Sequence, residues 1–259
     1  ETILDAGRFA FWLEKLQQAQ LIAFDTETTS IDAQQAQIVG VSFAVSAGEA
    51  AYVPLTHSYM GVPTQLDRDT VLLALKPLLE DPHKAKLGQH AKYDINVLAN
   101  CAIGGDPANG IEMRGVAFDS MLESYVLDAT ATRHNMDALA LKYLDHTTIA
   151  FEDIAGKGAK QLTFDQISLE QAGPYAAEDA DITLRLHQVL WPRLQAVPGL
   201  ASVLTDIEMP LVPVLARIEH EELRERPVLR SAVELHVVSP RPRPRGQRHV
   251  FVIRLVGRG

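Results

Sequence analysis

The stretch Leu21-Ile22-Ala23-Phe24-Asp25-Thr26-Glu27-Thr28 decides the fold, because an apolar run leads directly into two acidic residues. The apolar residues predict a buried strand. Side chains two apart on a strand share a face, so Asp25 and Glu27 are expected side by side. Neighbouring carboxylates repel each other and favour a proton or a cation between them. Oxygen ligands without cysteine or clustered histidine indicate Mg²⁺ or Mn²⁺, and a pair of solvated acids is the alternative.

The segments around this strand predict a mixed sheet flanked by helices, which is an α/β or α+β layer structure. The apolar spacing of Phe9, Trp12, Leu13 and Leu16 indicates an amphipathic helix. Apolar runs over 38–45 and 51–55 predict two strands that pair antiparallel with the first. We expect a further strand over 86–88, and helices over 70–79, from 92, over 119–128, 135–144 and 168–195, the last interrupted at Gly173-Pro174.

Composition places the chain among folded globular proteins, with 259 residues, 47% hydrophobic and 22% charged. Cys101 is the only cysteine, which excludes an internal disulfide and a multi-cysteine zinc site. A single cysteine also favours a reducing compartment, so we expect a cytoplasmic protein. No apolar run reaches the roughly 20 residues that cross a membrane, and no basic-then-apolar leader precedes the first helix.

Charge divides the chain near residue 220. Residues 1–220 contain 15 basic and 29 acidic residues, whereas residues 221–259 contain 9 arginines and 4 acids. Arginine and proline alternate over 240–245, a pattern that favours a solvated extended segment. We therefore expect 221–259 to be an irregular basic tail and not a folded domain. It is either a sequence foreign to the main domain, such as an out-of-frame segment, or a basic arm for DNA.

Two further segments carry acidic residues near helix starts. In Gly88-Gln89-His90-Ala91-Lys92-Tyr93-Asp94, Asp94 opens a helix, where an acid also complements the helix dipole. In Tyr175-Ala176-Ala177-Glu178-Asp179, the first and last residues are neighbours on one face of a helix that Pro174 is expected to open. Each segment taken alone is explained equally well by ordinary capping or packing.

In combination, the segments 24–28, 88–94 and 175–179 resemble the three motifs of the 3′→5′ proofreading exonuclease domain of bacterial DNA polymerase I. That family belongs to the exonucleases with three Asp, one Glu and a Tyr. Segments 118–125, 151–158 and 207–211 resemble it as well, so the resemblance covers about 1–220. It implies a ribonuclease H-like fold, with an exonuclease domain over 1–200. It also implies the start of a linker helix over 201–220, toward a polymerase domain that this chain lacks.

The resemblance also implies the chemistry of the site. Two divalent ions, Mg²⁺ or Mn²⁺, would be held by Asp25, Glu27, Asp94 and Asp179. Asp25 would bridge both ions, Glu27 and Asp179 would bind the ion on the nucleophile side, and Asp94 the other. Tyr175 would orient the attacking water. The reaction would release nucleoside 5′-monophosphates from single-stranded or frayed DNA 3′ ends, as a proofreading step in DNA replication and repair.

By the same resemblance, five residues would line the 3′-terminal nucleotides, namely Thr28, Ile31, Gln89, His90 and Phe151, and Arg133 would contact a phosphate. Core packing explains Ile31 and Phe151 equally well, and a surface ion pair explains Arg133 equally well. His90 stands where the family usually has Asn. A neutral imidazole still donates a hydrogen bond, so we expect modulated activity and not its loss.

Two other functions remain open at this point. Related domains trim RNA 3′ ends, and the 2′-hydroxyl by which a protein would sense RNA leaves no signature in this sequence. A non-catalytic scaffold is the second alternative, and the presence of all four acids together with Tyr175 argues against it. Proofreading further implies a polymerase domain or a polymerase protein as partner.

Overall fold

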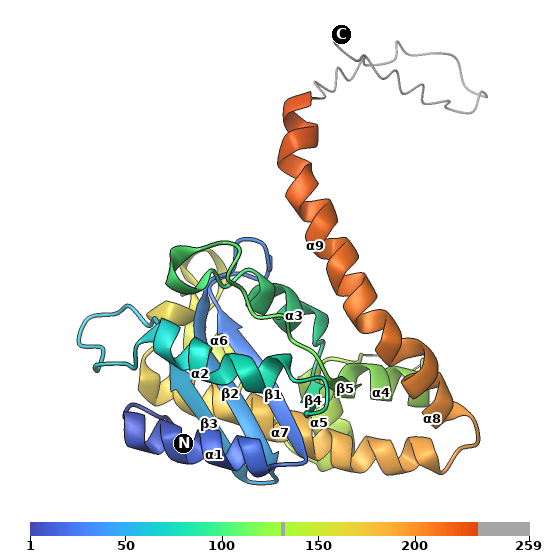
Figure 1. Ribbon diagram of the computed structural model, residues 1–259. Helices are drawn as coiled ribbons and strands as arrows, with labels where there is room; N and C mark the ends of the chain where they lie inside the picture. Colours follow the sequence, from blue (N-terminus) through green and yellow to red (C-terminus); the bar gives the residue numbers. More distant parts are fainter. Residues whose placement is uncertain (131–132, 233–259) are drawn as a thin grey trace, which may run out of the picture.

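The computed structural model describes residues 1–130 and 133–232, with side chains up to Glu221 (Figure 1). Within them a five-stranded sheet has the order β3-β2-β1-β4-β5. The strands are β1 Leu21–Thr28, β2 Ile38–Ser46, β3 Glu49–Pro54, β4 Ala85–Gly88 and β5 Val116–Asp119. β1 to β3 pair antiparallel, whereas β4 and β5 run parallel to β1, so the sheet is mixed. The order places β1 at the centre.

Helices cover both faces of this sheet (Figure 1). The α-helices are α1 Ala6–Gln18, α2 Arg68–Glu80, α3 Lys92–Ala99, α4 Ser120–Leu127, α5 Met136–Leu144, α6 Phe151–Ala155, α7 Leu169–Gln195, α8 Leu200–Val203 and α9 Met209–Ala232. Short 3₁₀ turns span Ile103–Gly105, Gly158–Lys160 and Phe164–Gln166, and a π-helical turn spans Leu204–Glu208. Apolar residues of α1, α2 and α3 form one core with the sheet, and α7 packs against β1, β2 and β3 on the other face.

Alternation along β1 separates the two faces. Ile22 and Phe24 are buried in the core beneath α1 and α2. Ala23 points the other way and packs against Ala180 of α7 together with Ala44 of β2. Small side chains on both sides of this contact let the helix backbone approach the sheet closely. The odd-numbered residues of β1 therefore face α7, and this includes Asp25 and Glu27.

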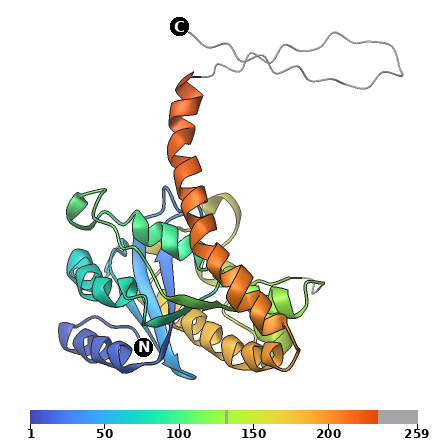
Figure 2. The same cartoon turned by 45° about the vertical axis from the view of Figure 1, so that its right-hand side comes forward.

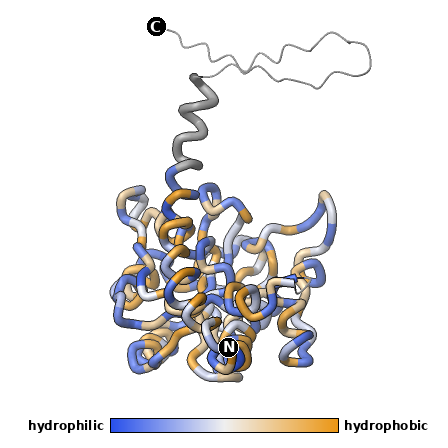
Figure 3. The backbone as a smooth tube through the Cα atoms, turned by 90° about the vertical axis from the view of Figure 1, so that its right-hand side faces the viewer, coloured by the Kyte–Doolittle hydropathy of each residue, from blue (hydrophilic) through white to orange (hydrophobic). Residues whose placement is uncertain are grey.

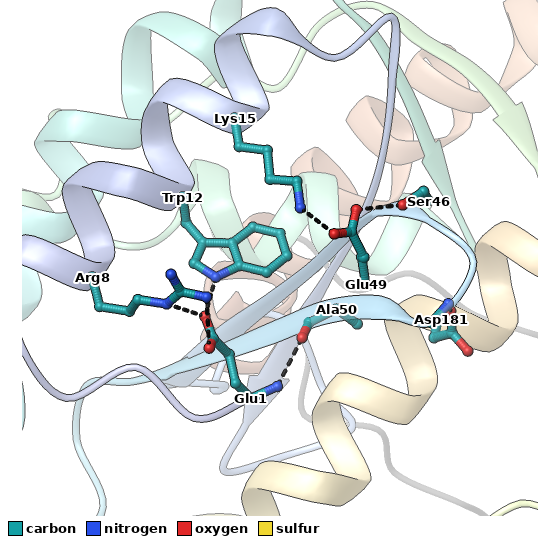
Figure 4. A network of polar contacts seen from close by, with 9 residues as sticks. Glu1, Arg8, Trp12, Lys15, Ser46, Glu49, Ala50 and Asp181 are labelled. Carbon is teal, nitrogen blue, oxygen red and sulfur yellow. Dashed lines mark hydrogen bonds and ion pairs between the residues drawn. The ribbon is translucent and has the colours of Figure 1, made fainter.

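The hairpin of β2 and β3 is tied to both α1 and α7 (Figure 4). The Glu1 carboxylate accepts two hydrogen bonds from the Arg8 guanidinium, and the Glu1 backbone nitrogen donates to the Ala50 carbonyl at 2.8 Å. At the turn of the hairpin, the Gly48 amide donates to the Asp181 carboxylate at 2.6 Å. These contacts fix the position of α7 relative to the sheet edge.

Helix α9 extends beyond the body of the domain (Figures 1 and 2). Met209, Val212 and Ala216 are buried against the domain. Up to Glu221, hydrophobic and hydrophilic residues alternate along the helix (Figure 3), and apolar residues on its opposite face, such as Leu211 and Val214, are exposed. Among the described residues, no helix is long and apolar enough to cross a membrane.

The structure confirms the mixed sheet flanked by helices and the antiparallel pairing of its first strands. Three details differ from expectation. α7 begins at Leu169 and continues through Gly173-Pro174, since a proline in the second turn removes only one helical hydrogen bond while the rest of the helix is buried. β5 was not expected as a strand. α6 was not expected as a helix.

The boundary expected near 220 falls inside α9, which continues to Ala232. Residues 201–220, expected to begin a linker helix, contain part of α8, the π-helical turn and the first half of α9, and their role as a linker toward a polymerase stays a prediction. Most of the predicted basic tail, 233–259, lies outside the described residues.

We predict that Ala180→Leu destabilises the domain by about 1–3 kcal/mol, because a larger side chain would push α7 away from β1 and β2. Ala10→Leu is the matched control, since Ala10 lies on the exposed face of α1 and should change stability by at most about 0.5 kcal/mol. Urea unfolding followed by circular dichroism measures both. Equal midpoints for the two variants would show that the close approach of α7 is not required.

Candidate active site

Three carboxylates meet between the end of β1 and α7. Asp25 and Glu27 project from β1 toward α7, where Asp179 lies one helical turn after Tyr175. Oxygen atoms of Asp25, Glu27 and Asp179 all lie within 4.8 Å of one another. Glu27 is 8% exposed, and the other two are half-buried. The structure thus brings the first and third predicted segments together in one acidic cluster.

Asp94 reaches the same place from the opposite face of the sheet. It lies in the first turn of α3 and is 2% exposed. Its Oδ1 accepts hydrogen bonds from the Thr26 amide at 3.0 Å and the Thr26 hydroxyl at 2.5 Å. Since Thr26 stands between Asp25 and Glu27 on β1, this pair of bonds holds the fourth carboxylate beside the other three.

Burial and mutual repulsion disfavour the charged forms of these acids. Burial raises the pKa of Asp25 to about 7. The pKa of Glu27 lies well above its usual range because of burial and of the charges on Asp25, Asp179 and Asp94. Burial also raises the pKa of Asp94 and Asp179, and the neighbouring Asp25 adds to both shifts. The cluster therefore favours either protons or a compensating cation.

The donor set fits a divalent cation. Oε1 of Glu27 is buried and has no hydrogen-bond partner in the described part of the chain, which is costly unless a ligand occupies the site. All the convergent atoms are carboxylate oxygens, which are the ligands that Mg²⁺ and Mn²⁺ prefer.

Tyr175 is placed to act through its hydroxyl. Its side chain lies near the Asp179 carboxylate, whose charge disfavours ionisation of the phenol, and its ring packs against Phe151 and Phe164 at centroid distances of 6.1 and 5.9 Å. Burial and the nearby carboxylates raise the pKa of Tyr175 far above its usual range. The hydroxyl therefore keeps its proton at neutral pH and can donate or accept a hydrogen bond, but it cannot act as a strong base.

A cleft of about 610 Å³ opens beside the acidic cluster. Asp25, Glu27 and Asp94 line it, whereas Asp179 and Tyr175 lie behind its lining residues. Five of the six residues expected to contact substrate line it, namely Thr28, Ile31, Gln89, His90 and Phe151. Ile31 is 99% exposed, so core packing does not explain it. Phe151 is half-buried and stacks on Phe164 at 6.4 Å, which makes it both a packing residue and part of the wall.

Arg133 is exposed and is not among the residues that line the cleft. It lies one residue before His134, whose carbonyl accepts a hydrogen bond from the Gln89 side-chain amide at 3.0 Å. The residue after Arg133 is thus linked to the cleft through Gln89. The phosphate contact of Arg133 itself stays a prediction.

Sequence reasoning missed several residues of the cleft. Tyr93 lines it, and its hydroxyl donates to the Ser30 carbonyl and lies within hydrogen-bond distance of the Thr28 hydroxyl. Tyr93 directly precedes Asp94 in the segment 88–94, and this position indicates that it lies near the acidic cluster. Residues 161–164 also line the cleft, and no sequence pattern indicated a role for them.

A mixed sheet flanked by helices that carries an acidic cluster at the end of its central strand defines a ribonuclease H-like fold. Residues 1–195 match the model of a 3′-5′ exonuclease family, and the chain belongs to that family.

Individual relatives agree with this assignment. DNA polymerase I of Pseudomonas aeruginosa is 76% identical over 219 residues, which cover 85% of this chain and 23% of the relative. The chain thus spans less than a quarter of the length of the curated relatives it matches.

Two solved structures share the fold. The structure of the POL domain of Pol1 from M. smegmatis, in complex with DNA primer-template and dNTP, has a TM-score of 0.63 and 21% identity, over 85% of this chain and 32% of that one. The structure of RNase D from Escherichia coli, described as an exoribonuclease involved in structured RNA processing, has a TM-score of 0.53 and 18% identity, over 83% of this chain and 50% of that one.

We predict that, with excess chelator, the protein loses stability as the pH rises from about 4 through about 7. A carboxyl whose pKa is higher in the folded than in the unfolded chain opposes folding once it must ionise. Asp25→Asn should remove part of this cost and raise the stability at pH 8 by about 1–3 kcal/mol relative to wild type. Thermal unfolding at pH 5 and pH 8 measures the effect.

Asp67→Asn is the matched control for this prediction. Asp67 is an exposed carboxylate whose hydrogen bonds to Thr70 lower its pKa, so its replacement should not stabilise the protein at pH 8. If Asp25→Asn is no more stable than wild type at pH 8, the acidic cluster does not carry the repulsion described.

Proposed function

We propose that this protein is a metal-dependent 3′→5′ exonuclease that releases nucleoside 5′-monophosphates from single-stranded or frayed DNA 3′ ends. The observation that carries the proposal is the convergence of Asp25, Glu27 and Asp179 within 4.8 Å beside an open cleft that Asp25 and Glu27 line, with Oε1 of Glu27 lacking a partner among the described residues. This arrangement suits phosphodiester hydrolysis, because divalent ions held by the carboxylates would place positive charge next to the phosphate that is attacked.

Asp25, Glu27 and Asp179, together with Asp94, would hold two divalent ions. Bound there, Mg²⁺ or Mn²⁺ would neutralise the phosphate and make a water molecule more acidic. Thr26 keeps Asp94 in position through its amide and hydroxyl.

The remaining site residues orient the reactants. The Tyr175 hydroxyl, which lies near the Asp179 carboxylate, would accept a hydrogen bond from the attacking water and direct it at the terminal phosphorus. Thr28, Gln89 and His90 offer polar groups to the sugar-phosphate backbone. Ile31 presents an exposed apolar side chain that can wedge against a base of any type, which suits single-stranded ends.

The negative charge of the domain should make its affinity for DNA depend strongly on divalent cations. Residues 1–220 carry 29 acidic and 15 basic residues, so a polyanion is repelled at long range. Bound divalent ions would supply positive charge at the point where phosphate must enter. Affinity for DNA should therefore fall sharply when the ions are removed.

DNA is the favoured substrate because the relative with 76% identity is named DNA polymerase I. The likeness to RNase D supports the fold and leaves RNA trimming as the second candidate. The named relatives are much longer than this chain, so the cellular role proposed is proofreading beside a polymerase domain or protein, in the cytoplasm. On this view 1–200 form the exonuclease domain, and 201–220 begin the connection to the polymerase.

We predict that the purified protein shortens a single-stranded DNA oligonucleotide from its 3′ end with Mg²⁺ or Mn²⁺ and not with excess chelator. Asp25→Ala should lower the rate by at least about a thousandfold, because it removes one of the three convergent carboxylates that would hold the ions. Asp67→Ala, remote from the cleft, should retain wild-type turnover. Products resolved on a denaturing gel and by chromatography provide the measurement.

Matched DNA and RNA oligonucleotides separate the two substrates. Faster hydrolysis of RNA would replace the DNA proposal with RNA trimming, and metal-dependent activity that survives Asp25→Ala would reject the mechanism.

For Tyr175→Phe we expect kcat to fall about tenfold to a hundredfold, since the ring still packs on Phe151 while the hydroxyl that directs the water is gone. The pH-rate profile should keep its shape, because the hydroxyl does not ionise near neutral pH. A profile that loses a basic limb in the variant would instead assign Tyr175 the role of a general base.

A further inference from the structure

The loop between β4 and α3 is held by a residue outside the cleft. β4 and β5 run parallel, and Gly88 at the end of β4 pairs in register with Asp119 at the end of β5. The loop then turns so sharply that a Cβ on Gly88 would lie 2.7 Å from the Cβ of Ala91. The carboxylate of Asp119 therefore lies beside the backbone of the tight turn that carries Gln89 and His90.

The backbone of this turn forms a concave site for an anion. His90 has a φ of 65°, in the left-handed region, and Ala91 follows with φ −53° and ψ −19°. A left-handed residue next to a right-handed one directs consecutive N–H groups to the same side, which creates an anion-binding nest. The Asp119 carboxylate fills it, accepting from the His90 amide at 3.1 Å and the Ala91 amide at 2.8 Å.

Asp119 also begins α4. Its Oδ1 accepts hydrogen bonds from the amides of Met121 at 2.9 Å and Leu122 at 3.3 Å, and the residue is only 2% exposed. One buried carboxylate thus joins four backbone donors from two segments far apart in sequence. The next residue strengthens the connection, since the Ser120 hydroxyl donates to the Gln89 side-chain oxygen.

We propose that Asp119 is a positioning residue for the DNA 3′ end, an inference that rests on the proposed function. By holding His90 in a left-handed conformation that a non-glycine residue rarely adopts, it presents Gln89 and His90 to the cleft. Because Asp119 occupies the nest, those two amides are unavailable to substrate phosphate. The loop therefore recognises DNA through its side chains.

Asp119→Asn tests the proposal with little change in volume. If the amide oxygen replaces Oδ1, the three bonds from His90, Met121 and Leu122 remain, while an NH₂ group faces the Ala91 amide and repels it. We expect KM for a single-stranded DNA oligonucleotide to rise about tenfold, with a smaller fall in kcat. Amide hydrogen exchange at His90 and Ala91 should accelerate more than in the core strands.

Asp67→Asn is the matched control. Asp67 likewise caps a helix, accepting from the Thr70 amide at 2.8 Å, but it is exposed and does not line the cleft. This variant should keep the wild-type KM and the wild-type exchange at residues 90 and 91.

Two results would overturn the proposal: a KM for Asp119→Asn within about twofold of wild type, or exchange at residues 90 and 91 no faster than in the control. If the variant does not fold, wild-type exchange decides, because a held loop predicts protection of both amides close to that of β1. Absence of any nuclease activity in the wild type would reject the proposed function instead, while the exchange data would still show whether Asp119 holds the loop.

Discussion

The carboxylates of Asp25, Glu27, Asp94 and Asp179 repel one another inside the domain, and the surrounding structure is built to hold them together. Burial strengthens the repulsion, because little water separates the charges. A flexible chain would let them move apart. Here two come from a central strand with a partner on each side, and the others come from helices packed on opposite faces of the sheet. The close approach of the four carboxylates therefore depends on the whole sheet and on the helices packed on both of its faces.

Close packing sets how near these groups can come. Ala23, Ala44 and Ala180 allow α7 to lie against the sheet, and the Asp181 bond to the β2–β3 turn fixes the helix along its length. On the other face, Thr26 ties α3 to β1 through Asp94. Each anchor lies within a few residues of a carboxylate. Small errors in any of them would be transmitted directly to the acidic cluster, where sub-ångström geometry matters for catalysis.

Local patterns in the sequence predicted the features that depend on local chemistry. The alternation of β1 placed Asp25 and Glu27 on one face, and the helical spacing of Tyr175 and Asp179 placed them together, because both periodicities follow from backbone geometry. Only the resemblance to a family predicted that these segments meet in space, because local periodicity carries no information about contacts between distant parts of the chain.

The features that were missed depend on tertiary context. β5 has only four residues and is defined by its pairing with β4, so the local sequence does not predict it as a strand. Pro174 was expected to open a helix, but α7 is stabilised by burial and continues through it. The left-handed conformation of His90 depends on a carboxylate 29 residues away in the chain. A wall of the cleft at 161–164 likewise has no local signal.

The alternation of β1 also bears on how this strand can change in evolution. Removing or adding one residue between Ile22 and Glu27 would rotate every later side chain to the opposite face, exchanging the acids with the residues that fill the apolar core. Both the acidic cluster and the hydrophobic interior would be lost in one step. Substitutions can accumulate one at a time along this strand, whereas viable length changes must keep its parity or be absorbed by a bulge, such as the irregularity already present between Glu27 and Thr28.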